Sequence, residues 1–183
     1  MTDLFPPLET KRLLLRLMKS DDLDFVFRHF SNPDVYHYLV DEEPVTTREQ
    51  AQEIVNFYVQ PSGKTFNRWV LELKSEKRPI GTCGYHQWHK NHYRAEIGYD
   101  LEPESWRRGL MTEALEAVIG FGFEKMDLNR ISATVHPGNK ASIHLLEKLG
   151  FRKEGLLRDY YHQAGSYYDH WLLSVLKKEW ITR

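Results

Sequence analysis

Alternation of apolar and polar residues predicts the strands of this chain. The clearest case is RISATVH at 130–136, where Ile131, Ala133 and Val135 fall on one face, as in a half-buried strand. The same alternation, interrupted by turn-like segments such as KNH at 90–92, predicts the other strands. The predicted strands are residues 8–18, 68–74, 80–88, 94–101, 130–136, 151–157 and 167–176.

A period near 3.6 residues predicts four helices. Ser20 is a suitable cap for a helix that runs to residue 30, and Thr47 with Gln50 makes a capping box for the next helix. Two more are predicted, one at 109–123 and one from 139 or 140 to a C-terminal cap at Gly150. The order β α α β β β α β α β β predicts one α+β domain over residues 1–183. Its sheet is mixed, with helices on both faces, and is not doubly wound.

Composition narrows the class of protein. Lys and Arg number 25 against 26 Asp and Glu, so the net charge is −1, which argues against a nucleic-acid partner bound through bulk charge. The one cysteine, Cys83, excludes an internal disulfide, fits a reducing cytoplasm, and lies mid-strand as a core residue does. No stretch approaches the roughly 18 apolar residues of a membrane span, and no secretory signal is visible. We therefore expect a cytoplasmic protein without a membrane partner.

Two motifs are superficially attractive but weak. SGKT at 62–65 ends like a phosphate-binding loop, yet Tyr58 stands where that loop needs its first glycine. His86, His89 and His92 are spaced by three, which alternates faces on a strand, and no carboxylate or cysteine completes a standard zinc set. We expect neither a nucleotide hydrolase nor a metal site.

The stretch WRRG at 106–109 precedes the third predicted helix directly. Unpaired backbone N–H groups and the helix dipole favour an anion at a helix N-terminus. Arg107 and Arg108 add positive charge, and Gly109 lets the backbone approach a bulky ligand. Two interpretations remain open on these grounds, a phosphate-binding turn and a solvated helix start.

Several stretches together resemble the GNAT superfamily of N-acetyltransferases, and within it the ribosomal-protein-alanine N-acetyltransferases. They are LETKRLLLR, RAEIGYDLEPESWRRGLMTEA, NRISATVHPGNKASIHLLEKLGF, EGLLRDYY and YYDHWLLSVLKKEW, and they cover nearly the whole chain. The resemblance implies a seven-stranded mixed sheet, splayed between its fourth and fifth strands. It also implies acetyl-coenzyme A in the splay as the co-substrate.

The family's pyrophosphate loop falls on residues 106–111. Gly109 matches the pattern, whereas Trp106 replaces its first polar residue and Met111 its last small one. Because the family holds pyrophosphate mainly through backbone N–H groups, binding is expected to survive both changes. The implied cradle is Arg107, Arg108, Gly109, Leu110, Met111 and Thr112.

The resemblance also implies contacts with the pantetheine arm. Asn139 matches an asparagine that contacts the arm, and Ser142 matches the residue beside the thioester sulfur. Helix capping is the alternative role for these two residues, although one residue can do both. The preceding strand offers backbone groups to the arm, at Ile97, Gly98, Tyr99 and Leu101.

Glu96 is the candidate base, because it begins the strand that flanks the expected cleft and could take a proton directly or through water. The alternative is a glutamate that faces solvent or pairs with Arg94. Many GNAT enzymes carry a tyrosine acid four residues before the glycine of their GF pair, and Leu146 stands there. Ser142 is therefore the remaining candidate acid.

The expected acceptor is the α-amine of a protein or peptide N-terminus. Its pKa of about 7.7–8.0, against 10.4 for lysine, makes the free amine roughly 3.5 kcal/mol easier to form at neutral pH. A polyamine or antibiotic amine is the alternative, and a catalytically silent regulatory module that binds coenzyme A is another. The acidic VDEEPV at 40–45 could attract a basic acceptor or be a solvated loop. Both a monomer and a homodimer fit the sequence.

Overall fold

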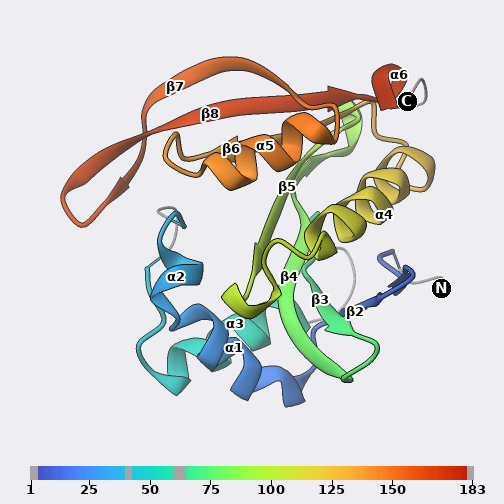
Figure 1. Ribbon diagram of the computed structural model, residues 1–183. Helices are drawn as coiled ribbons and strands as arrows, with labels where there is room; N and C mark the ends of the chain where they lie inside the picture. The colour runs from blue at the N-terminus through green and yellow to red at the C-terminus, as the bar shows by residue number, and fades with distance from the viewer. Residues whose placement is uncertain (1–3, 40–42, 60–64, 181–183) are drawn as a thin grey trace.

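The computed structural model describes residues 4–39, 43–59 and 65–180. Its centre is one mixed sheet of eight strands in the order β1-β2-β3-β4-β5-β6-β8-β7 (Figure 1). The strands are β1 (Leu8–Glu9), β2 (Leu13–Leu17), β3 (Trp69–Leu73), β4 (Arg78–His89), β5 (Arg94–Leu101), β6 (Arg130–Val135), β7 (Arg152–Gln163) and β8 (Ser166–Leu176). The predicted α+β class is confirmed.

The sheet has eight strands where the sequence predicted seven. The first predicted strand, 8–18, is a hairpin in which Leu8 pairs with Leu15 and Glu9 with Leu14. Thr10 closes its turn, because its backbone N–H donates to the carbonyl of Leu13 at 3.0 Å. Strand β1 has only two residues, too few to show a pattern of their own, so the sequence does not reveal the turn. At the other end of the chain β7 extends to Gln163, six residues beyond its predicted end at 157.

The helices are α1 (Leu23–Phe30), α2 (Pro33–Tyr36), α3 (Arg48–Val59), α4 (Leu110–Glu124), α5 (Lys140–Lys148) and α6 (Lys177–Trp180). The capping box before α3 is confirmed, since the Thr47 and Gln50 side chains each accept the other's backbone N–H, at 3.3 and 3.1 Å. The predicted cap at Ser20 is wrong. Residues 20–22 form a 3₁₀ turn, in which Asp22 accepts the Lys19 N–H at 2.7 Å. Helices α2 and α6 were missed, because four residues are too few to show a helical period.

Helices cover both faces of the sheet, and β3 shows this most directly. Trp69 and Leu71 belong to the main hydrophobic cluster, which also contains the buried faces of α4 and α5. Between them Val70 points to the other face, into a smaller cluster with α1 and α3. In Figure 1, α4 and α1 accordingly lie on different sides of the strands. Both faces of β3 are therefore buried, and the sheet is the middle layer.

Strands β5 and β6 separate part of the way along. They pair in parallel at Arg94 with Arg130, Ala95 with Ile131 and Glu96 with Ser132. Beyond Glu96 the β5 ladder continues only toward β4, as far as Leu101 opposite Gly81. The β6 ladder continues toward β8. An opening results at residues 97–101, and it is the predicted splay, numbered one strand later because of the N-terminal hairpin.

The fit of α4 against the sheet generates a paired stability prediction. A methyl group at Gly122 would lie 2.2 Å from the hydroxyl oxygen of Tyr85, which donates to the Val118 carbonyl, whereas one at Gly120 would meet nothing within 4 Å. We expect Gly122→Ala to lower the free energy of unfolding by about 1–3 kcal/mol through overpacking. Gly120→Ala should raise it by up to about 1 kcal/mol through helix propensity. Urea denaturation measures both, and equal effects at the two positions would contradict this packing.

Candidate active site

A cavity of about 120 Å³ lies where β5 and β6 separate. Its walls come from β4, β5, β6, the start of α5 and the β7–β8 hairpin. The cavity brings together six of the residues that the sequence singled out: Glu96, Ile97, Gly98, Tyr99, Asn139 and Ser142. Leu101 and the predicted cradle at 107–112 do not line it, and the cradle lies at the N-terminus of α4.

The N-terminus of α4 is shaped by its backbone. Gly109 is the N-cap residue with φ of 72°, and Arg107 has φ of 58°, so two residues of the turn adopt left-handed conformations. No side chain caps the helix, and the first backbone N–H groups of an α-helix lack intrahelical acceptors. Leu110 and Met111 bury their side chains in the core. Their contribution to any ligand at this turn is therefore made by the backbone.

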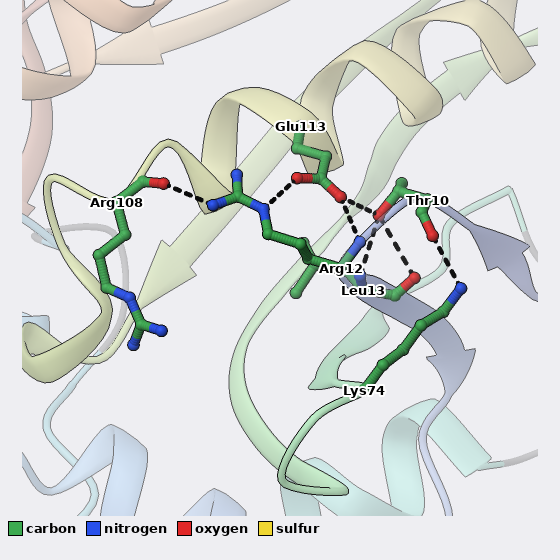
Figure 2. Close-up of polar contacts among 6 residues, drawn as sticks. All are labelled: Thr10, Arg12, Leu13, Lys74, Arg108 and Glu113. Atoms are coloured by element: carbon green, nitrogen blue, oxygen red, sulfur yellow. Dashed lines mark hydrogen bonds and ion pairs between the residues drawn. The ribbon is translucent and has the colours of Figure 1, made fainter.

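An ion pair with the N-terminal hairpin holds this turn in place (Figure 2). The Arg12 guanidinium donates to the Glu113 carboxylate at 2.6 Å and to the carbonyl oxygen of Arg108 at 2.8 Å. Glu113 also accepts the Arg12 backbone N–H at 2.7 Å and the Thr10 hydroxyl at 2.5 Å. The hairpin turn, the first turn of α4 and the loop before it thus form one hydrogen-bonded unit. We call Thr10, Arg12 and Glu113 the hairpin clamp.

The hairpin clamp has two consequences for an anion at the helix mouth. Because C=O and N–H point in opposite directions across a trans peptide, fixing the Arg108 carbonyl toward Arg12 turns the Gly109 N–H away from it. The Glu113 carboxylate would otherwise repel an anion at this helix end, and Arg12 neutralises it. Burial alone would raise the pKa of Glu113, but hydrogen bonds from Thr10 and Arg12 outweigh it and lower that pKa.

Trp106, which replaces the polar residue of the family's loop, folds back onto β5. Its indole N–H donates to the carbonyl oxygen of Leu101 at 2.7 Å, while the ring remains half-exposed. The Leu101 carbonyl is therefore already paired within the chain. Of the backbone groups predicted for a pantetheine arm, those of Ile97, Gly98 and Tyr99 border the cavity.

Glu96 is largely buried, with 12% of its side chain exposed. Its carboxylate accepts the Thr134 hydroxyl at 2.8 Å and lies 3.8 Å from Nε2 of His86. Burial favours the neutral acid, yet interactions with His86 and Thr134 outweigh it, so the pKa of Glu96 lies below its ordinary value. The carboxylate is thus ionised at neutral pH, and its partners lie in the cavity rather than in solvent.

Asn139 and Ser142 lie together at the start of α5. The Asn139 side-chain oxygen accepts the Ser142 backbone N–H at 3.1 Å, so the capping role of Asn139 is confirmed. The Ser142 hydroxyl points across the splay and lies 2.8 Å from the Tyr99 hydroxyl. Leu146, at the position where the family resemblance implied a tyrosine acid, is fully buried in the main core.

An aromatic wall around the cavity was missed from the sequence. It consists of Tyr38, His136, Tyr161 and His170, in which Tyr38 stacks on His136 at 5.3 Å and Tyr161 meets His170 edge to face at 4.7 Å. Burial and the nearby His37 lower the pKa of His136, whose Nδ1 accepts the Gly138 N–H at 3.0 Å. The imidazole is therefore neutral near pH 7. Widely separated segments supply the wall, so no local motif announces it.

The other charged groups of the cavity satisfy one another. Asp100 accepts the backbone N–H and hydroxyl of Thr82 at 2.9 and 2.6 Å, and it lies 2.6 Å from His29 and 3.2 Å from Arg68. Burial would raise the pKa of Asp100, but His29 and Arg68 outweigh it and lower that pKa. This carboxylate is a buried structural anion, whereas Glu96 lacks a comparable cationic cage.

Of the weaker sequence motifs, the histidine set contributes His86, which lines the cavity beside Glu96. Residues 62–64 of SGKT and residues 40–42 of the acidic segment lie outside the described residues. Cys83 is buried, as expected for a core residue, and burial raises the pKa of its thiol. In the described ranges, no three His, Cys, Asp or Glu side chains are arranged to hold a metal ion. Within the same ranges no helix is long and apolar enough to cross a membrane.

Comparison with known proteins identifies the fold and the family. Residues 12–152 match the family model described as an acetyltransferase (GNAT) domain. The uncharacterized N-acetyltransferase YoaA of Bacillus subtilis (strain 168) is 40% identical, over 95% of this chain and 98% of that protein. The [ribosomal protein uS5]-alanine N-acetyltransferase of Escherichia coli (strain K12) is 30% identical, over 94% and 92%.

Solved structures agree with the sequence matches. A GNAT-family acetyltransferase from Bacillus anthracis has a TM-score of 0.83 at 29% identity, covering 94% of this chain and 99% of its own. The spermidine N-acetyltransferase of Vibrio cholerae, solved with coenzyme A and spermine, has a TM-score of 0.82 at 24% identity with the same coverage, and supports the fold alone. The matched domain, the relatives and the splayed sheet agree: the chain belongs to the GNAT family of N-acetyltransferases.

Proposed function

We propose that this acetyltransferase modifies the α-amino group at the N-terminus of a peptide or protein, with acetyl-coenzyme A as donor. The observation that carries the proposal is Glu96, an ionised carboxylate in an aromatic-walled cavity at the splay. The site is therefore suited to one positive charge. Acceptor nitrogen and thioester would meet between β5 and α5.

The described residues fit the donor in two places. The uncapped N-terminus of α4, with its left-handed turn and nearby arginines, suits the pyrophosphate. The edge of β5 at Ile97–Tyr99 has no partner on β6 and suits the amide groups of the pantetheine arm. Bound acetyl-coenzyme A supplies an activated acetyl thioester. The remaining chemistry belongs to the residues of the cavity.

The low pKa of Glu96 defines its role in this proposal. Because the pKa of Glu96 is depressed and that of the amine is near 8, proton transfer from the ammonium group to this carboxylate is unfavourable. Glu96 is therefore a poor final acceptor of the amine's proton. It can instead hold the arriving ammonium and stabilise the positive charge that develops on nitrogen during attack. The proton then passes through water to solvent. The rate should therefore rise with pH along the titration of the acceptor amine, not that of Glu96.

The charges of the cavity favour a monoamine over a polyamine. A polyamine carries several cations and is best held by several free carboxylates. Among the described residues that line the cavity the carboxylates are Glu96 and Asp100, and Asp100 is already paired with His29 and Arg68. The Arg68 guanidinium would also repel a second ammonium group.

The relatives give independent support. The Escherichia coli relative is named for acetylation of the alanine of ribosomal protein uS5, and it aligns over most of both chains. The spermidine enzyme shares the fold at lower identity. A peptide N-terminus also suits the aromatic wall, which can pack against the first side chains of an acceptor.

The first prediction of this proposal concerns the acceptor. With acetyl-coenzyme A, thiol release should occur with alanine- and serine-starting peptides, and not with their N-terminally blocked forms, spermidine or an aminoglycoside. Glu96→Gln should lower kcat/KM for the reactive peptide by about 100-fold through loss of charge stabilisation. Glu124→Gln, which removes an exposed carboxylate at the end of α4, is the matched control and should leave turnover unchanged.

Turnover of spermidine in preference to the peptides would overturn the α-amine assignment. Wild-type activity of Glu96→Gln would instead remove this carboxylate from the mechanism. The two results are separable, because the acceptor panel uses the unaltered chain and the variant is assayed with whichever amine reacts best.

The second prediction concerns the donor and the hairpin clamp. Arg12→Gln should weaken coenzyme A binding about 3- to 10-fold, because the helix mouth loses the guanidinium that holds the Arg108 carbonyl and neutralises Glu113. Glu116→Gln removes an exposed carboxylate one turn further along α4 and should leave the affinity unchanged. Isothermal titration calorimetry measures both Kd values. Equal Kd values for the two variants would show that the hairpin clamp does not position the cradle.

A further inference from the structure

Tyr99 and Ser142 form a hydroxyl pair that spans the splay. Strand β5 last pairs with β6 at Glu96, and Tyr99 lies three residues further along β5. Ser142 is in the first turn of α5. Their oxygens are 2.8 Å apart, and both residues line the cavity. The Asn139 cap fixes the backbone of Ser142 by accepting its N–H. Leu146 places no hydroxyl on the next turn of the same helix.

We propose that Tyr99 is a positioning residue that donates its hydroxyl proton to Ser142 Oγ and so directs the Ser142 O–H toward the sulfur of coenzyme A. This inference rests on the proposed donor site, and it extends that proposal to how the leaving group is stabilised. The tyrosine acid that the family resemblance implied at position 146 is then replaced by a tyrosine from the neighbouring strand, acting through the serine.

The direction of the hydrogen bond follows from the chemistry of the two groups. A phenol is a stronger acid than an aliphatic alcohol, so it is the better donor of the pair. Burial raises the pKa of Tyr99, and the hydrogen bond with Ser142 only partly offsets this, so the phenol keeps its proton. With Oγ accepting from Tyr99, the serine hydrogen is free to rotate toward a third group.

The resulting step is balanced without proton transfer from Tyr99. The acceptor nitrogen attacks the thioester carbonyl carbon, a C–N bond forms and the C–S bond breaks with its electron pair on sulfur. The amine's proton leaves to solvent and balances the thiolate charge. Ser142 donates a hydrogen bond to the sulfur, and Tyr99 strengthens that donation by polarising the serine hydroxyl. A donor that keeps its proton stabilises the thiolate throughout.

The titratable groups next to Tyr99 do not account for a change in the pKa of the bound thiol. Beside it in the sheet is Cys83, the register partner of Tyr99 on β4, and burial raises the pKa of that thiol so that it stays neutral. Glu96 and Tyr99 are three residues apart on β5, so their side chains point to opposite faces of the strand. The remaining titratable or charged groups that line the cavity are Tyr38, Arg68, His86, Asp100, His136, Tyr161 and His170.

The test measures the thiol of coenzyme A bound to the intact chain, so it needs no acceptor. Thiolate absorbance is titrated against pH for the unaltered chain, Tyr99→Phe, Ser142→Ala and the double variant. We expect the bound thiol to have a pKa below that of free coenzyme A, titrated in the same buffer, and Tyr99→Phe to raise the bound value by about one pH unit. Ser142→Ala should raise it at least as much. The double variant should add nothing to Ser142→Ala, because Tyr99 acts through the serine.

Tyr85→Phe is the matched control, since it removes another buried tyrosine hydroxyl, the one bonded to the Val118 carbonyl, without altering the splay. It should leave the bound thiol pKa unchanged. An unchanged thiol pKa in Tyr99→Phe, with coenzyme A still bound, would overturn the inference and leave the contact as a structural tie between β5 and α5. If the unaltered chain does not bind coenzyme A, the proposed donor site itself fails and the inference fails with it.

Discussion

The separation of β5 from β6 after the pairing of Glu96 with Ser132 organises the whole site. Parallel strands normally continue their ladder, and ending one leaves backbone N–H and C=O groups of β5 without partners on that side. The chain satisfies one of them itself, by directing the Trp106 indole to the Leu101 carbonyl. The groups nearer Glu96 border the cavity instead. An enzyme that binds an amide-containing arm can hydrogen-bond the arm along such a free edge, as it would another strand.

Keeping the sheet open requires rigid support on both of its faces. On one face α4 and α5 pack on the main core, and on the other α1 and α3 cover the smaller cluster. Under the opening, the His29–Asp100–Arg68 network ties α1 to β5 through buried charge. Such a network is costly unless every member is satisfied, and here Thr82 completes the carboxylate's contacts. The N-terminal hairpin supports the far end of the splay through Arg12 and Glu113.

The sequence revealed the parts of this arrangement that depend on local pattern. Strand β5 was predicted at its observed bounds. Asn139 was predicted as a possible helix cap, which the structure confirms, and it also lines the cavity. Glu96 was singled out, although its Thr134 and His86 partners depend on strand register. Local pattern could not show the hairpin within residues 8–18, because its first strand, β1, is only two residues long. It also could not show the aromatic wall, since Tyr38 and His170 meet only after the sheet is assembled.

The two ends of the splay differ in charge, and the proposed function depends on this difference. At the α4 end, helix N–H groups and arginines favour an anion, and Arg12 of the hairpin clamp neutralises the Glu113 carboxylate. At the Glu96 end, one ionised carboxylate favours a cation, and the neutral His136 adds no opposing charge. On the proposed function, a donor with an anionic end would thus be drawn to the N-terminus of α4, and an acceptor with a cationic amine to the cavity beside Glu96. Tyr99 and Ser142 lie between these ends, where the thiolate's negative charge would develop and neither end would neutralise it directly. Neutral donors at this midpoint can stabilise that charge without attracting a counter-ion that would block the acceptor.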